Sequence, residues 1–111
     1  MTVLEYVNKE RRERKKKPLK KGRLLRLSAR RMAKKLNRTH VLKHDAVIHV
    51  NKKFWWAGEV LGDGQKSSKQ IVEEWMASRA HYDIIMSDKA RRLGAAHVGK
   101  YWVAHLGRIG P

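Results

Sequence analysis

Three residues that could take part in chemistry are evenly spaced late in the chain: Trp75, Ser78 and His81. On a helix this spacing drifts slowly around one face, so we expect the three side chains to share one surface. A serine and a histidine are the types of a nucleophile and its general base, and Asp83 is close in sequence. A helical i, i+3 pair, however, does not show the hydrogen-bonded arrangement of nucleophile, base and orienting group that catalysis needs, nor an oxyanion hole. We therefore favour a serine that bonds local backbone.

The charge of the chain is its strongest compositional feature. The formal net charge is +17 over 111 residues, and residues 1–40 hold 16 lysines and arginines against 3 glutamates. Residues 41–111 hold 11 against 7 acidic residues. A field this strong and lopsided attracts polyanions, such as nucleic acid, anionic cell-wall polymers or acidic protein surfaces.

Composition narrows the class of protein. At 111 residues, with 41% hydrophobic residues and four tryptophans, the chain fits one folded domain over residues 1–111. Cysteine is absent, which excludes disulfides, a thiolate zinc site and a cysteine nucleophile. No apolar run has the length of a membrane span or signal peptide, so we expect synthesis in the cytoplasm.

The basic first part, residues 1–40, is predicted to be helical and part of the fold. Val3, Leu4 and Val7 form the apolar stripe of a helix that a proline and a glycine then end. A second amphipathic helix follows, whose apolar positions are Leu25, Ala29, Met32, Ala33 and Leu36. The cations of both helices are candidates for anion binding: Arg11, Arg12, Arg14, Lys15, Lys16, Lys17, Arg26, Arg30, Arg31, Lys34 and Lys35.

The remainder, residues 41–111, is predicted to hold loops, a helix and a hairpin. The alternation in residues 46–50 suggests a strand, and the three glycines of residues 58–64 suggest turns. Ser67 with Gln70 is a capping box that begins a helix, and a shorter helix is expected over residues 82–86.

The last part of this region is predicted to be a β-hairpin that turns at Gly99-Lys100. Tyr101, Val103 and His105 are expected on one face of its second strand, with the alternate residues on the other. One layered α+β domain is the economical interpretation.

The order of these motifs resembles the CAP superfamily of cysteine-rich secretory, antigen 5 and pathogenesis-related proteins, especially its small cysteine-free bacterial branch. The segments that carry the resemblance are VNKERRERKKKPLKK, LSARRMAKKLNRTH, WAGEVL, IVEEWMASRAHYDIIM and LGAAHVGKYWVAHLG. The resemblance implies a three-layer α-β-α sandwich, in which helices flank both faces of a small antiparallel sheet.

The resemblance also implies a cleft in which two histidines and two glutamates meet, and which holds a divalent metal in some members. His40 matches the first histidine, with His44 as a less favoured candidate, and Glu59 matches the first glutamate. The chain departs from the pattern at the other two positions, where it has Ser78 and Tyr101.

Two interpretations of the expected cleft follow. His40, Glu59 and His81 have the donor types of a zinc-like site with an open position. The alternative is that these groups hydrogen-bond one another and the loop backbone, which we favour because the spacing specifies no metal. Trp75 and Trp102 could likewise offer a stacking platform, although their apolar surroundings favour core packing. One residue of Phe54-Trp55-Trp56 is expected to face a partner.

The sequence therefore predicts a non-enzymatic structural or binding module whose basic helices meet an anionic macromolecule or an acidic protein surface. Sequence-independent nucleic-acid binding through phosphates is one alternative. Metal-dependent or hydrolytic activity at the His/Glu cleft is the other. Members of the resembled family are usually secreted, and this chain shows no signal. We thus expect it to leave the cell, if at all, inside an assembly such as a phage virion, as a minor head or tail component.

Overall fold

A computed structural model describes residues 1–110. The helices and strands follow in the order α1 (Val3–Glu13), β1 (Lys20–Lys21), α2 (Arg23–Thr39), β2 (Phe54–Asp63), α3 (Ser68–Met76), α4 (Arg79–Ile85), β3 (Arg92–Val98) and β4 (Tyr101–Ile109). The strands form one sheet in the order β1-β3-β4-β2. In the part described, no helix combines the length and apolar character that crossing a membrane requires.

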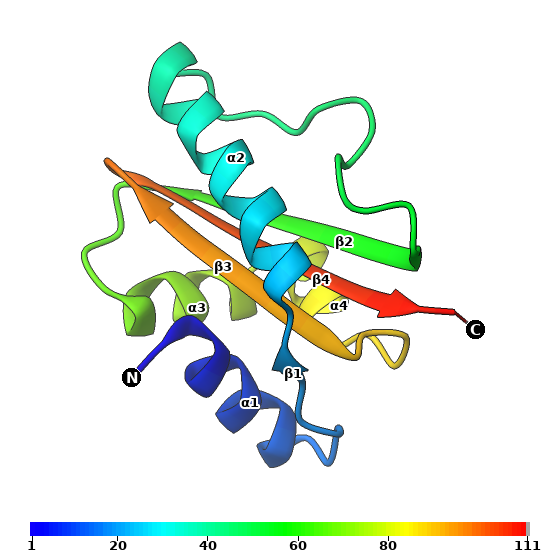
Figure 1. Cartoon of the computed structure of the whole chain (residues 1–111). Helices are drawn as coiled ribbons and strands as arrows, with labels where there is room; N and C mark the ends of the chain where they lie inside the picture. Colours follow the sequence, from blue (N-terminus) through cyan, green and yellow to red (C-terminus); the bar gives the residue numbers. More distant parts are fainter. Residues whose placement is uncertain (111) are drawn as a thin grey trace.

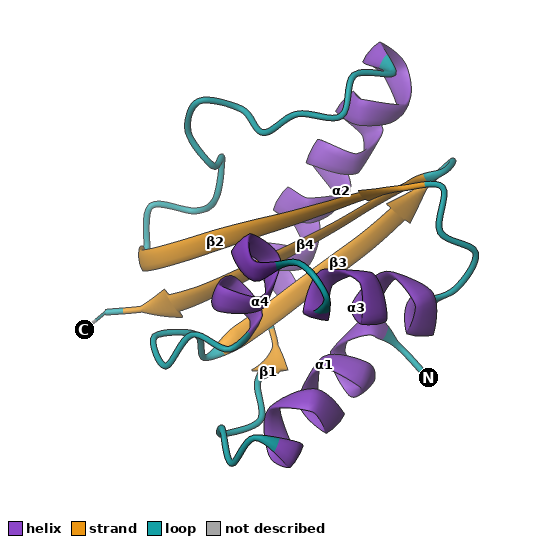
Figure 2. Ribbon diagram, turned by 180° about the vertical axis from the view of Figure 1, so that it is seen from behind, coloured by secondary structure: helices purple, strands orange, loops and turns teal. Residues whose placement is uncertain are grey.

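The helices cover both faces of this sheet. Helix α2 crosses one face and packs on β3 and β4, whereas α1, α3 and α4 lie on the other face (Figures 1 and 2). The predicted α+β sandwich is confirmed. The sheet is mixed and not antiparallel throughout, because β1 pairs with β3 in parallel. The other two pairings, β2 with β4 and β3 with β4, are antiparallel.

Helix α1 begins with a capping box. The hydroxyl of Thr2 accepts from the backbone N–H of Glu5, and the Glu5 carboxylate accepts from the N–H of Thr2. The helix ends at Glu13, earlier than the run of lysines suggested, since Lys15 takes a left-handed backbone conformation with φ +60°. Val3 and Val7 are buried as predicted.

Helix α2 has the amphipathic pattern that the sequence predicted, with all five apolar positions buried. Its first turn lies directly on Gly94 of β3. A Cβ atom at Gly94 would be 2.0 Å from the backbone nitrogen of Arg26 and 2.4 Å from the carbonyl carbon of Leu25. The missing side chain thus sets how closely the helix approaches the sheet.

Two predictions in the middle of the chain were wrong. Residues 46–50 form no strand; Val47 is exposed, so their alternation marks no buried face. Of the three glycines predicted to mark turns, only Gly64 does so, with a φ of +95°, because Gly58 and Gly62 belong to strand β2. Gly58 and Gly62 lie within the strand because helix side chains occupy the space of a Cβ there. Ile84 approaches the first position and Ile71 the second.

The segment between Ser67 and Met86 forms two helices. Ser67 caps α3 as predicted, accepting from the N–H of Gln70. The helix ends at Met76, and Ser78 occupies the N-cap position of α4. Trp75 and His81 consequently lie on different helices, so the predicted shared helical face was wrong. Trp75 is a core residue, as favoured, and its indole N–H donates to the carbonyl of Leu61 at 2.8 Å.

The β-hairpin is confirmed. Strands β3 and β4 are joined at Gly99-Lys100, where Gly99 has the positive φ of +59° typical of tight hairpin turns. Trp102 packs into the core on the α1 face of the sheet, and Tyr101 and Val103 pack beneath α2. The predicted alternation of faces is therefore correct, and it decides where His105 points.

Candidate functional site

The polar centre of the molecule is a buried pair on neighbouring strands. Glu59 of β2 lies directly opposite His105 of β4, and both side chains face α2. The imidazole Nε2–H of His105 donates to Oε2 of Glu59 at 2.7 Å. Both residues are almost inaccessible to solvent, with exposed fractions of 5% for Glu59 and 1% for His105. A carboxylate this buried requires such a partner.

Helix α2 extends this pair with a serine. The Oγ atom of Ser28 lies 2.6 Å from Nδ1 of His105 and 3.0 Å from the carbonyl oxygen of Leu25. The hydroxyl has one proton, so it can donate to only one of these two acceptors. If it donates to Nδ1, the histidine is neutral; if it donates to Leu25, both ring nitrogens of His105 carry protons. In either state the bonds join α2, β4 and β2.

The segment after α2 completes the network with a second histidine. Nδ1 of His44 lies 2.7 Å from Oε1 of Glu59, so each carboxylate oxygen has an imidazole partner. Burial raises the pKa of the Glu59 carboxyl, but hydrogen bonds from His105 and His44 lower it by more. The pKa therefore lies below its ordinary value, and the carboxylate is ionised at neutral pH.

The favoured match for the first histidine, His40, does not contact Glu59. It ends α2 with a left-handed φ of +57°, and its exposed ring lies 6.3 Å from the ring of Tyr101. Tyr101 pairs with Asp63, four residues along β2 from Glu59, and is buried in the core. The structure thus gives the less favoured His44 the bond to the carboxylate and places both His40 and Tyr101 away from it.

The other two cleft candidates belong to α4. Ser78 is the N-cap of this helix, but its side chain makes no capping hydrogen bond; its carbonyl accepts from the N–H of Tyr82. His81 is half-buried, and among the described residues its Nδ1 has no hydrogen-bond partner. Burial, with a smaller contribution from the charge of His44, lowers the pKa of His81. His81 makes no hydrogen bond to Glu59 or to its histidine partners.

The donor groups do not fit a metal ion. Each carboxylate oxygen of Glu59 is engaged by an imidazole nitrogen, and the second nitrogen of His105 is engaged by Ser28. Over residues 1–110, no three histidine, aspartate or glutamate side chains are grouped as metal ligands. The set His40, Glu59 and His81 is not assembled, because His40 lies elsewhere. The histidines act as hydrogen-bond partners of the carboxylate.

The order Ser28, His105, Glu59 has the residue types of a nucleophile, base and orienting acid. Its setting is unlike that of a nucleophile. Ser28 is almost fully buried in the middle of α2, where backbone N–H groups are used by the helix and offer no oxyanion hole. Sequence reasoning missed Ser28 and His105. The only available signals were a serine within an apolar stripe and a histidine on an apolar strand face.

A cavity of about 460 Å³ opens beside this network, between α2 and the segment that follows it. Its cations come from one face of α2, where Arg31, Lys35 and Arg38 line it. Asp45 enters the cavity from the following segment, and its carboxylate lies 2.5 Å from Nζ of Lys35 and 3.7 Å from His49. The hydrogen bond from Lys35 is the main cause that lowers the pKa of Asp45. This face of α2 therefore already holds one carboxylate.

One predicted anion-binding residue needs correction. Arg11 is buried, and its guanidinium donates to the backbone carbonyls of Lys17, Ile85 and Ser87. Burial lowers the pKa of Arg11. It joins the end of α1 to the end of α4, and it is not available to an external anion. Lys16 is also engaged, in an ion pair with Asp88.

The comparison with protein families decides the lineage. The family model of the cysteine-rich secretory protein family, CAP, matches residues 4–104. The chain belongs to this family. No curated protein matches the sequence.

Solved structures show the same CAP fold at low sequence identity. An outer surface protein from Borrelia burgdorferi is 16% identical, with a TM-score of 0.87, over 97% of this chain and 90% of that one. An extracellular SCP-domain protein from Bacillus anthracis is also 16% identical, with a TM-score of 0.88, over 96% of this chain and 39% of that one. A venom allergen-like protein from Schistosoma mansoni has a TM-score of 0.75 and 16% identity, over 98% and 87% of the two chains. At these identities the likeness concerns the fold.

Proposed function

We propose that this CAP domain is a non-enzymatic binding module that meets an anionic macromolecule through helix α2. The observation that supports the proposal is the composition of this helix. Its 17 residues include no aspartate or glutamate, and its buried face leaves the cations exposed. The exposed ones are Arg23, Arg26, Arg30, Arg31, Lys34 and Arg38.

Within residues 1–110, none of these six cations forms an ion pair with an acidic side chain. The ion pairs within residues 1–110 involve one α2 side chain, Lys35, which meets Asp45. Cations near the end of α1 differ, since Arg14 is paired with Glu10. Unpaired guanidinium groups along one helix can bind the repeated charges of an anionic polymer. The ion pair of Asp45 with Lys35 is an example of a carboxylate bound by a cation of α2. We therefore propose that the anionic partner contacts the cations of α2 in preference to those of α1.

Duplex DNA is a suitable first probe because its phosphates are regularly spaced. We expect binding whose logarithm falls linearly with the logarithm of salt concentration, by about 0.9 for each phosphate contact. Arg30→Glu with Lys34→Glu should reduce that slope by about 2. The matched control is Lys66→Glu with Lys69→Glu, at the start of α3 on the other side of the sheet, which changes net charge equally (Figure 2).

The control variant distinguishes a localised binding face on α2 from a general electrostatic attraction of DNA to the net charge of the protein. Equal weakening by both double variants would contradict a binding face on α2, because net charge alone would then explain the affinity. An absence of DNA binding at low salt would remove nucleic acid as the partner, and anionic polysaccharide or an acidic protein would be probed in the same way. The location in a virion stays a prediction from the sequence.

Hydrolysis is the second candidate, and the Ser28–His105–Glu59 order is the observation that favours it. A fluorophosphonate probe labels activated serines covalently, so it reports on Ser28 without a known substrate. We expect no labelling, because Ser28 is buried and lacks an oxyanion hole. Labelling that Ser28→Ala abolishes would establish the enzyme and contradict the proposed non-enzymatic role.

A further inference from the structure

Strand β3 has an uncovered edge over most of its length. Its outer neighbour β1 is only two residues long and pairs with Arg92 and Leu93, after which the chain turns away into α2 (Figure 1). The N–H of Gly22 donates to the carbonyl of Leu93 at 2.9 Å, which ends this ladder. The remaining residues of β3, through Val98, pair with β4 alone.

The backbone groups on this edge can be assigned by alternation. Because Leu93 directs its backbone groups toward β1, Ala95 and His97 direct theirs to the same side. Within residues 1–110 these outward N–H and C=O groups have no hydrogen-bond partner. An unpaired row of this kind is a template for an added strand.

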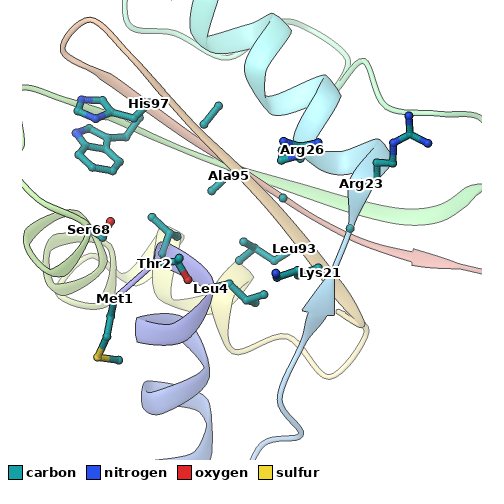
Figure 3. Close-up of a pocket in the computed structure, with 15 residues that line it drawn as sticks. Met1, Thr2, Leu4, Lys21, Arg23, Arg26, Ser68, Leu93, Ala95 and His97 are labelled. Atoms are coloured by element: carbon teal, nitrogen blue, oxygen red, sulfur yellow. The ribbon is translucent and has the colours of Figure 1, made fainter.

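A pocket of about 750 Å³ lies along the same edge. Figure 3 shows its two walls. Leu4 of α1 and Met1, which precedes that helix, line one wall, while Arg23 and Arg26 line the other from α2 on the other side of β3. The first wall is mainly apolar, and the second carries the basic groups.

The end of the pocket near the hairpin is aromatic. The rings of His97 and Trp102 are stacked with their centroids 3.6 Å apart, and both residues line the pocket. Trp102 is buried, so the stacked pair forms a fixed boundary. Together with Leu93 and Ala95, it continues the apolar wall along the α1 face of the strand.

Side chains of an added strand would alternate between these two walls. We propose that the β3 edge binds an extended peptide segment of a partner protein that alternates acidic and apolar residues. Its backbone pairs with Ala95 and His97. Its acidic side chains meet Arg23 and Arg26, and its apolar side chains enter the pocket beside Leu4.

Charge decides against a second copy of this chain as the occupant. A second copy carries the same basic rim of Lys21, Arg23 and Arg26 and the same formal net charge of +17, and like charges disfavour that contact. An acidic strand is attracted to the same rim. This inference goes beyond the polyanion contact of α2, since it requires the backbone edge and names the sequence pattern of the partner.

The test uses a fluorescent, end-blocked peptide that alternates glutamate and valine, measured by anisotropy with the intact protein. A peptide of the same composition with all glutamates before all valines keeps the charge and loses the alternation. We expect it to bind on the order of tenfold more weakly, because it cannot satisfy both walls at once.

Backbone methylation of the peptide tests strand pairing without changing the protein. N-methyl groups on alternate residues give two versions, of which one removes the N–H groups that face β3 and the other those that face solvent. The first should lose binding by on the order of thirtyfold, since two edge hydrogen bonds disappear. The second should bind as the unmodified peptide does, and amide NMR shifts should concentrate at Ala95 and His97.

Variants of α2 separate this site from the proposed polyanion face. Arg26→Glu should weaken peptide binding on the order of tenfold. Arg30→Glu, one helical turn further along, should weaken DNA binding and leave the affinity for the peptide unchanged. Failure to bind DNA would therefore leave the peptide result intact. Equal binding of alternating, block and methylated peptides would overturn the edge site. The edge site would also be overturned if the protein alone formed dimers and Ala95→Pro converted them to monomers.

Discussion

Glu59→Ala tests whether the buried network holds the fold together. The variant removes both imidazole bonds to the carboxylate and leaves His105 with an unpaired nitrogen in the core. The buried bond to His105 accounts for about 1.5–3 kcal/mol of the free energy of unfolding. The bond to His44 adds less, about 0–1 kcal/mol, since the His44 side chain is 55% exposed.

The sum predicts a loss of about 3 kcal/mol, or a fall in Tm of roughly 12 °C for a chain of this size. Urea unfolding followed by circular dichroism measures the first quantity, and a thermal melt the second. His44→Ala is the matched control and should cost less than about 1 kcal/mol. A Glu59→Ala variant as stable as the parent would refute the view that this network joins α2 to the sheet.

Acid provides a second measurement of the same residue. The pKa of Glu59 in the folded state lies below 4.5, its ordinary value, so the unfolded chain binds the proton first as the pH falls. The stability contributed by the ionised carboxylate is therefore complete above about pH 4.5 and is lost as the pH falls through the folded pKa. Glu59→Gln cannot titrate, so its difference from the parent should shrink below pH 4.5. A constant difference down to pH 3 would contradict the assignment.

Three further predictions concern residues outside the network. Arg11→Met removes a buried guanidinium bonded to three carbonyls and should cost about 3 kcal/mol in urea unfolding, whereas Arg12→Met at the exposed neighbouring position should cost under about 0.5 kcal/mol. Gly94→Ala puts a Cβ 2.0 Å from the Arg26 nitrogen and should cost about 3 kcal/mol or more in the same assay; a loss below about 1 kcal/mol would show that α2 can shift freely. The pKa of His81 in the folded state lies below 6.5, its ordinary value, so the parent should lose stability as the pH falls from 7 toward that folded pKa. His81→Gln should remove this part of the pH dependence of the urea midpoint.

Periodicity predicted the helices and the hairpin well because each is set by neighbours in sequence. The stripe of α2, the cap at Ser67 and the turn at Gly99 all depend on contacts within a few residues. The glycines of β2 misled for the opposite reason. Gly58 and Gly62 are required by side chains of the later helices α4 and α3, and the pattern of the strand itself carries no signal of those contacts.

The candidate site was predicted only in part. The resemblance to CAP proteins identified Glu59, but it favoured His40 where His44 makes the bond. The choice depends on where α2 ends and how the following segment returns to β2. His105 and Ser28 were missed because their meeting requires β4 to pair with β2 and α2 to cross that strand face. No spacing in the sequence encodes that meeting.

The sequence by itself determined the family, the amphipathic helices and the concentration of positive charge in residues 1–40. Composition and short periods are enough for these, since each is a sum over residues or a local repeat. Only the tertiary structure decided which charges are usable, because Arg11 is buried against distant carbonyls while Arg30 stays exposed. It also decided that β3 keeps an open edge, because whether a strand has an unpaired edge depends on which other strands lie beside it in the sheet.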